Sequence, residues 1–165
     1  MPFKWRFFRF TNYFHIGLVS LLTFFLIVGW ASQESEPELW TYLLASLAPP
    51  LLITNAVNNL ILLGKYYPEK LPGKQFSTYV KILFGVSIAP FAFVGLITGF
   101  VINDECIQPL VEDRPVEFSG LTTAFLFILA FLTGFHALWY QVVLRKTIRR
   151  NFDLGIDQFL TDENP

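Results

Sequence analysis

The sequence has few of the residues on which disulfide frameworks, redox centres and metal sites depend. Its 165 residues include one cysteine, Cys106, and two histidines. A single cysteine excludes an internal disulfide, a CxxC redox pair and a cysteine-rich metal site within one chain. The sequence also has no glycine-rich phosphate loop and no basic run interleaved with aromatic residues, so nucleic acid is not an expected partner.

Acidic residues are missing from the apolar parts of the chain. All 13 Asp and Glu residues lie outside the four long apolar runs described below. Proton-coupled pumps and antiporters typically carry the proton on a carboxylate inside the membrane, so this class is disfavoured. There is no HExxH motif, and no aspartate accompanies a serine and histidine within the runs. The sequence therefore predicts a protein that is not an enzyme.

Apolar residues, by contrast, are abundant. They make up 53% of the chain, aromatic residues make up 18%, and the mean hydropathy is +0.48. The apolar residues form four runs that are each about 30 Å or longer as helices, enough to cross a bilayer. We predict an all-α membrane protein, an up-down bundle of four transmembrane helices forming a single domain over 1–165, with a short tail over 145–165. The predicted spans are 12–31, 39–64, 82–102 and 119–144.

The first run follows a basic start, as the apolar region of a signal peptide does. Gly29-Trp30-Ala31 also has the small-x-small pattern of a cleavage site. The run is longer than the usual apolar region of a signal peptide, so we expect it to be retained as a helix.

The distribution of the cations predicts the orientation. Eleven of the 12 Lys and Arg residues lie in the N-terminal segment, the loop over 65–81 and the C-terminal segment, and Arg114 is the exception. Cytoplasmic segments of membrane proteins carry the excess of Lys and Arg. We therefore predict a multi-pass protein of the cell (inner) membrane with both termini in the cytoplasm.

The stretch from Ala48 to Lys65 reads APPLLITNAVNNLILLGK and contains three asparagines within an apolar run. Asn55, Asn58 and Asn59 span about 100° of one helix face, which should point into the bundle. Small or polar residues also share one face of the fourth run, and they are Thr123, Ala130, Gly134, Ala137 and Gln141.

Depth along the helices places several polar side chains in the cytoplasmic half of the bundle. They predict a polar pocket that binds a polar molecule, an ion or a lipid headgroup, lined by His15, Asn55, Asn58, Asn59, His136 and Gln141. The alternative is that the asparagines join the helices, each contributing about 1 kcal/mol.

Prolines interrupt two of the predicted spans. Pro49-Pro50 and Pro90 remove backbone donors, so we expect them to kink the second and third helices. Broken helices near the midplane occur in transporters, although proline is also common in spanning helices as a simple kink.

His15 and His136 lie at similar depth on helices that are adjacent in a closed bundle. One interpretation is a pair of axial ligands to a b-type haem. The other is that each histidine hydrogen-bonds a neighbour, Thr11 or Asn12 for His15 and Thr133 or Tyr140 for His136. Because a ligand pair alone is a weak motif, we expect no cofactor and no metal.

The leading hypothesis is a small non-enzymatic membrane protein that acts as a binding or interaction unit, as a subunit of a complex, a sensor or a carrier. A b-type haem protein and a transporter or channel for a small polar solute are the alternatives. The predicted partners are the lipid bilayer and either other membrane subunits or further copies of the chain.

Overall fold

A computed structural model describes the backbone of residues 1–31 and 39–162 and the side chains of residues 1–28 and 46–155. The segment 32–38 between the first two predicted spans, the side chains of the Gly29-Trp30-Ala31 pattern and the last three residues lie outside the described parts. All regular structure within those parts is helical. Its elements are α1 (Phe3–Ala31), α2 (Leu39–Ile61), η1 (Leu62–Tyr66), α3 (Lys74–Ile102), η2 (Asn103–Ile107), α4 (Gln108–Val111) and α5 (Phe118–Asp162).

Four of the helices are long and apolar enough to cross a membrane, as the sequence predicts. These segments are Phe3–Val28, Ser46–Tyr66, Lys74–Val111 and Phe118–Gly155. The helices extend beyond the apolar runs, because the flanking basic and polar residues are also compatible with a helix. In particular, α5 continues from the end of the fourth run at Leu144 to Asp162, about 27 Å further, so most of the predicted tail belongs to this helix.

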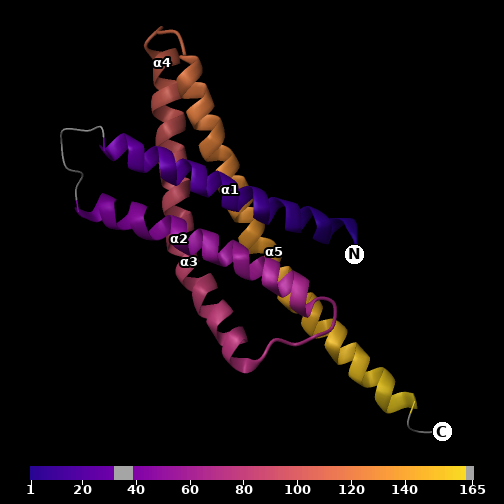
Figure 1. Ribbon diagram of the computed structural model, residues 1–165. Coiled ribbons are helices and arrows are strands. Elements are labelled where there is room, and N and C mark those ends of the chain that lie inside the picture. Colours follow the sequence, from indigo (N-terminus) through magenta and orange to yellow (C-terminus); the bar gives the residue numbers. More distant parts are fainter. Residues whose placement is uncertain (32–38, 163–165) are drawn as a thin grey trace.

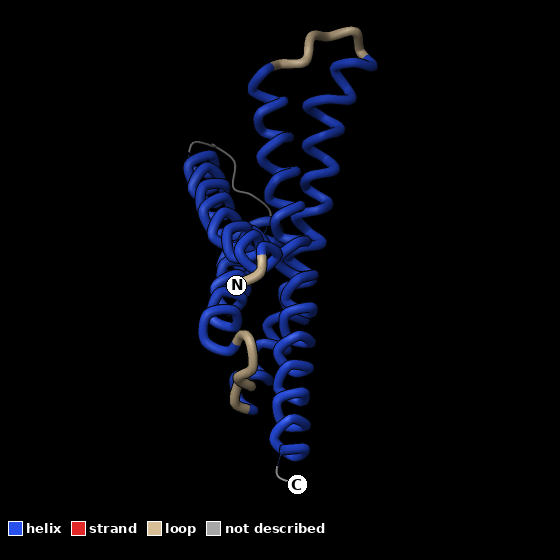
Figure 2. Tube along the Cα trace, turned by 90° about the vertical axis from the view of Figure 1, so that its right-hand side faces the viewer, coloured by secondary structure: helices blue, strands red, loops and turns tan. Residues whose placement is uncertain are grey.

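The four long helices form two antiparallel hairpins, α1 with α2 and α3 with α5 (Figure 1). The hairpins cross steeply, and in Figure 2 the upper parts of α3 and α5 stand side by side, away from the other pair. At the crossing α1 packs against α5 and α2 packs against α3, which closes the ring of four. This crossing departs from the nearly parallel packing expected of an up-down bundle.

Side-chain size accounts for the crossing. Small and polar residues allow the helices to approach where the hairpins meet, and Ala130 and Ala137 are almost completely buried there. Gly134 lies between them and is buried as well. Further along, the rings of Phe91 on α3 and Phe131 on α5 stack with their centroids 4.9 Å apart. This stack lies within the α3–α5 hairpin and holds its two helices apart by the thickness of two rings.

The end of the bundle with the N-terminus and the α2–α3 loop contains a closely packed aromatic and aliphatic cluster. Trp5 and Phe8 are fully buried, although cations surround them in the sequence. They pack against residues of η1, α3 and α5, and the buried members of this basic-end core are Trp5, Phe8, Leu62, Leu63, Val80, Leu144 and Ile148. Cations beside aromatic residues are typical of a helix end at the headgroup surface, yet three of the first eleven side chains, those of Trp5, Phe8 and Thr11, lie in the interior.

Large apolar side chains cover the outside of the helices. Phe24, Phe100 and Phe125 are each about 60% exposed or more. Soluble proteins rarely expose so much contiguous apolar surface, whereas lipid tails accommodate it.

The helical backbone continues through the prolines of both helices, Pro49 and Pro50 in α2 and Pro90 in α3, and the kink expected at Pro49-Pro50 stays a prediction. In Figure 1, α3 changes direction near its middle, and Pro90 is the seventeenth residue from its start at Lys74. A bend there fits the loss of a backbone hydrogen bond at proline.

Candidate functional site: a polar layer below an apolar cavity

Next to the basic-end core lies a layer of buried polar side chains, which we call the polar layer. Asn59 on α2 is fully buried at its centre. Its Nδ2 donates to Oδ1 of Asn12 on α1 at 3.0 Å and to the carbonyl of Ala137 on α5 at 3.2 Å. Asn12 in turn donates from Nδ2 to the Phe8 carbonyl at 2.7 Å. One asparagine side chain therefore connects three helices.

A second contact in the polar layer joins α2 to α5. Nε2 of Gln141 donates to Oδ1 of Asn55 at 3.1 Å, and both side chains are buried. Within the described side chains, some buried polar atoms of this layer have no hydrogen-bond partner, and they are Asn58 Nδ2, Asn59 Oδ1, Ser87 Oγ and Gln141 Oε1. Buried polar atoms ordinarily bind protein groups or water, so we expect the layer to be partly hydrated.

The two histidines make a reciprocal exchange with two threonines across the α1–α5 interface. Nδ1 of His15 on α1 lies 2.9 Å from Oγ1 of Thr133 on α5. Nδ1 of His136 on α5 lies 2.9 Å from Oγ1 of Thr11 on α1. The sequence had suggested a partner on the same helix for each histidine, and the structure swaps the partners between the helices.

The surroundings of His136 do not suit a haem shared by the two histidines. The centroids of the Tyr140, Phe7 and Phe8 rings lie 4.3, 5.3 and 5.8 Å from that of His136. A porphyrin ligated by His136 would have to displace these rings. Among the described residues, no group of three or more His, Cys, Asp or Glu side chains is placed to hold a metal ion.

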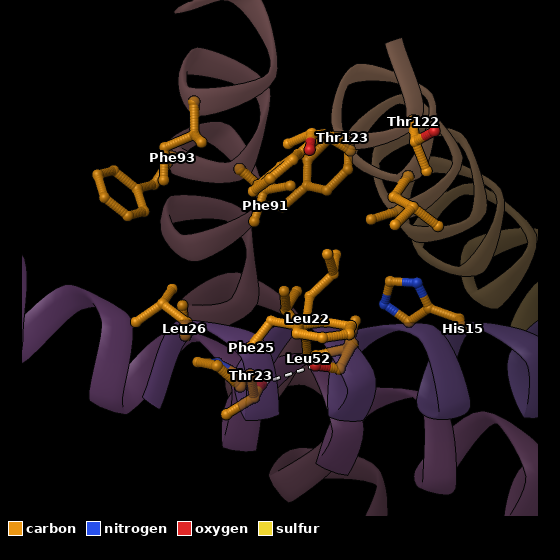
Figure 3. Close-up of a pocket in the computed structure, with 18 residues that line it drawn as sticks. His15, Leu22, Thr23, Phe25, Leu26, Leu52, Phe91, Phe93, Thr122 and Thr123 are labelled. Atoms are coloured by element: carbon orange, nitrogen blue, oxygen red, sulfur yellow. Dashed lines mark hydrogen bonds between the residues drawn. The ribbon is translucent and has the colours of Figure 1, made fainter. Parts of the chain in front are cut away.

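On the other side of the polar layer, a cavity of about 620 Å³ opens between the two hairpins (Figure 3). Its volume is in the range typical of small-molecule sites. All four long helices contribute to its walls, and the described wall residues include no Lys, Arg, Asp or Glu. The residues that line it are His15, Val19, Leu22, Thr23, Phe25, Leu26, Ala48, Pro49, Leu52, Phe91, Phe93, Val94, Ile97, Thr122, Thr123, Leu126, Phe127 and Ala130.

The threonine hydroxyls of the cavity wall already donate hydrogen bonds to carbonyl groups of their own helices. Oγ1 of Thr23 donates to the Val19 carbonyl at 2.7 Å. Thr122 and Thr123 donate in the same way to the carbonyls of Phe118 and Ser119. These hydroxyls therefore have no hydrogen left to donate to a ligand.

His15 is different, because its hydrogen bond leaves one ring nitrogen free. The hydroxyl of Thr133 has a single hydrogen, and the carbonyls of Leu129 at 2.8 Å and Ala130 at 3.2 Å are both placed to accept it. We assign that hydrogen to Leu129, so that the Thr133 oxygen accepts from Nδ1–H of His15 at 2.9 Å and Nε2 is the acceptor nitrogen of the neutral ring. The hydrogen bonds of the described residues include none at Nε2. Figure 3 shows the imidazole directed toward the space enclosed by the cavity walls.

The predicted site residues thus fall into two places. Asn55, Asn59 and Gln141 converge in the polar layer, Asn58 is buried beside them, and His136 packs among aromatic rings at its edge. None of these five lines the apolar cavity, whereas His15 lies at the boundary and touches both regions.

Sequence reasoning missed the cavity and two residues that hold His15 in place. Thr133 fixes the tautomer of His15, and Gly134 provides room for the ring, since a Cβ there would lie 3.2 Å from Cε1 of His15. The small face predicted for the fourth run was the available signal. Four of its five members are buried, and Thr123 lies on the cavity wall.

Comparison of the chain with models of protein families, with curated proteins and with solved structures found no match. Any functional proposal therefore depends on the geometry of the polar layer and the cavity.

Proposed function

We propose that the protein is a non-enzymatic, multi-pass protein of the cell membrane that binds an uncharged amphiphile in the apolar cavity. The proposed orientation puts both termini and the loop over 65–81 in the cytoplasm. Eleven of the 12 cations support this orientation, because they belong to segments at one end of the bundle. The cavity then lies in the outer half of the membrane, and the polar layer and the basic-end core separate it from the cytoplasm.

The observation that carries the proposal is the free Nε2 of His15 in an otherwise apolar wall. An acceptor at this point favours a ligand with a hydrogen-bond donor at one end. The described residues of the wall carry no charge, which disfavours an ionised ligand, since burying an unpaired charge is costly. A long-chain or isoprenoid alcohol has this chemistry. The side chains of the polar layer largely hydrogen-bond one another. We therefore propose that the ligand occupies the cavity beside the layer and not the layer itself.

The proposal can be tested with a matched pair of photoreactive probes. A diazirine-bearing hexadecanol and its methyl ether differ only in the hydroxyl hydrogen. In phosphatidylcholine vesicles, we expect the alcohol to label cavity residues such as Leu22, Leu52 and Leu126 about fivefold more than the ether does. That ratio is what one hydrogen bond of ordinary net strength supports. Mass spectrometry of the labelled peptides gives both yields.

Two variants connect this preference to His15. His15→Leu should abolish the difference between alcohol and ether, and Thr133→Val should reduce it because it frees the His15 tautomer. Thr23→Val is the matched control, since the Thr23 hydroxyl is bonded to its own helix and should not contribute. Equal labelling by the two probes in the unmodified protein would contradict the alcohol. Labelling of the cavity no stronger than that of the exposed Phe24 and Phe125 would contradict the cavity itself.

The orientation has its own test, for which the native cysteine is a reporter. Cys106 lies in η2, in the segment proposed to face outward, and is partly exposed. A membrane-impermeant maleimide should label Cys106 in intact cells. A cysteine introduced at Lys70 in a Cys106→Ser background should react only after the cells are opened. The reverse pattern would overturn the proposed orientation.

A further inference from the structure

A second cavity lies at the basic end of the molecule, between the start of α3 and the last part of α5. Its volume is about 450 Å³. Arg145, Lys146 and Arg149 line it from one face of α5, and Ser77 and Lys81 line it from one face of α3. Its described lining residues include no Asp or Glu. We call it the basic cavity.

Among the side chains that the structure describes, the four cations of the basic cavity have no acidic partner. In the part of the chain whose side chains are described, the salt bridge present is between Arg114 and Glu112, far away in sequence near η2 and α4. Four like charges around one cavity repel one another, and the repulsion falls when an anion enters. The guanidinium of Arg145 is also held in place, since its central carbon lies 5.3 Å from the centroid of the Phe84 ring.

The depth of the basic cavity matches the level of lipid headgroups. Lys81 immediately precedes the third apolar run, and Arg145 immediately follows the fourth. Both positions therefore mark the point where hydrocarbon gives way to the polar surface of the bilayer. A hydrophobic patch of the same wall, containing Leu71 and Val142, could contact the adjoining glycerol and acyl groups.

We propose that the basic cavity binds a phosphate group, supplied by the headgroup of an anionic phospholipid. Arginine guanidinium groups bind phosphate oxygens through two parallel hydrogen bonds, and the lysine ammonium groups add charge. The Ser77 hydroxyl can donate a further hydrogen bond. A soluble phosphate has the same chemistry, so the test separates the two sources. This inference does not depend on what occupies the apolar cavity.

The experiment is native mass spectrometry of the full-length protein in a neutral detergent. The protein is titrated with equal amounts of phosphatidylglycerol and phosphatidylcholine of the same acyl chains. We expect at least tenfold preferential retention of one phosphatidylglycerol. The double variant Arg145→Gln, Arg149→Gln should reduce the retention of phosphatidylglycerol more than tenfold, because each cation near the lipid surface is expected to strengthen binding about fivefold.

Arg6→Gln with Arg9→Gln is the matched control. It removes the same charge from the same end of the chain, at exposed positions outside the basic cavity, and should change retention less than twofold. An equal loss in the control would show general attraction by the basic end and would overturn the proposal. If the arginine variant does not fold, the exposed Lys146→Gln should still lower retention about fivefold, and no change there would overturn the proposal.

Inorganic phosphate at millimolar concentration identifies the source. Phosphatidylglycerol that stays bound in its presence supports the lipid headgroup. Complete displacement would contradict the lipid source and assign the basic cavity to a soluble phosphate. Equal retention of phosphatidylglycerol and phosphatidylcholine would overturn the proposal in either form.

Discussion

The polar layer and the apolar cavity are built by the same four helices, yet they differ in almost every physical respect. In the polar layer the helices are close, and asparagine, glutamine and threonine side chains bond across them. In the cavity the hairpins have diverged, and a wall of aliphatic and aromatic side chains surrounds open space. The polar side chains that a sequence singles out thus bond the helices to one another, and the open space lies among ordinary apolar residues.

The largest contrast is expected between the basic-end core and the cavity wall. Leu144 is fully buried in the core, so Leu144→Ala should remove packing contacts and lower the free energy of unfolding by about 3 kcal/mol. Leu126 already borders open space, so Leu126→Ala should lower it by less than about 1 kcal/mol. Reversible unfolding in mixed micelles measures both values. Equal losses would mean that the cavity wall is packed as closely as the core.

A somewhat smaller effect is expected where the two regions meet. Gly134→Ala would place a Cβ 3.2 Å from Cε1 of His15 and from the Phe91 ring, and overpacking of this kind costs about 1–3 kcal/mol. The matched control is Gly99→Ala on α3, where no atom would lie within 4 Å of the new Cβ. That control should be neutral or stabilise the helix by up to about 1 kcal/mol. The comparison would fail if both variants changed stability in the same direction.

Within the polar layer, two adjacent asparagines should respond differently. Asn59→Leu removes two interhelical hydrogen bonds and should destabilise the protein by about 1–2 kcal/mol. Asn58→Leu removes a buried Nδ2 that has no partner among the described residues, so its effect should lie within about 0.5 kcal/mol of zero. Both can be measured by the same unfolding assay. A large loss at Asn58 with none at Asn59 would reverse the roles assigned here.

The smallest expected change is spectroscopic. Because aromatic rings pack around His136, adding haem to the purified protein should give no Soret band that depends on the two histidines. The absorbance spectrum should be the same for His136→Phe as for the unmodified protein. A band that disappears in both His15→Phe and His136→Phe would restore the haem interpretation.

The sequence predicts the helices better than it predicts their arrangement. Hydrophobic length alone gives the four membrane-length segments, since each exceeds what a bilayer requires. Helical periodicity also places Asn55, Asn59 and Gln141 correctly in the interior, because their faces are small or polar. These properties are local, so they can be read from one run at a time.

The crossing of the hairpins and the cavity are not local properties. They depend on the room that Gly134 leaves for His15 and for Phe91, which are contacts between residues far apart in the chain. The exchange between His15 and Thr133 was missed for the same reason. Either histidine has a plausible partner on its own helix, and only the packing of α1 on α5 selects the partner across the interface.

The two histidine–threonine pairs also fix how α1 is aligned along α5. Thr11 and His15 on α1 lie opposite His136 and Thr133 on the antiparallel α5. Both hydrogen bonds therefore form in one and the same alignment of the two helices. Sliding α1 past α5 by one turn, about 5.4 Å, would break both pairs at once. Since lipid provides no hydrophobic force to choose among neighbouring alignments, two modest hydrogen bonds can decide which alignment the finished bundle adopts.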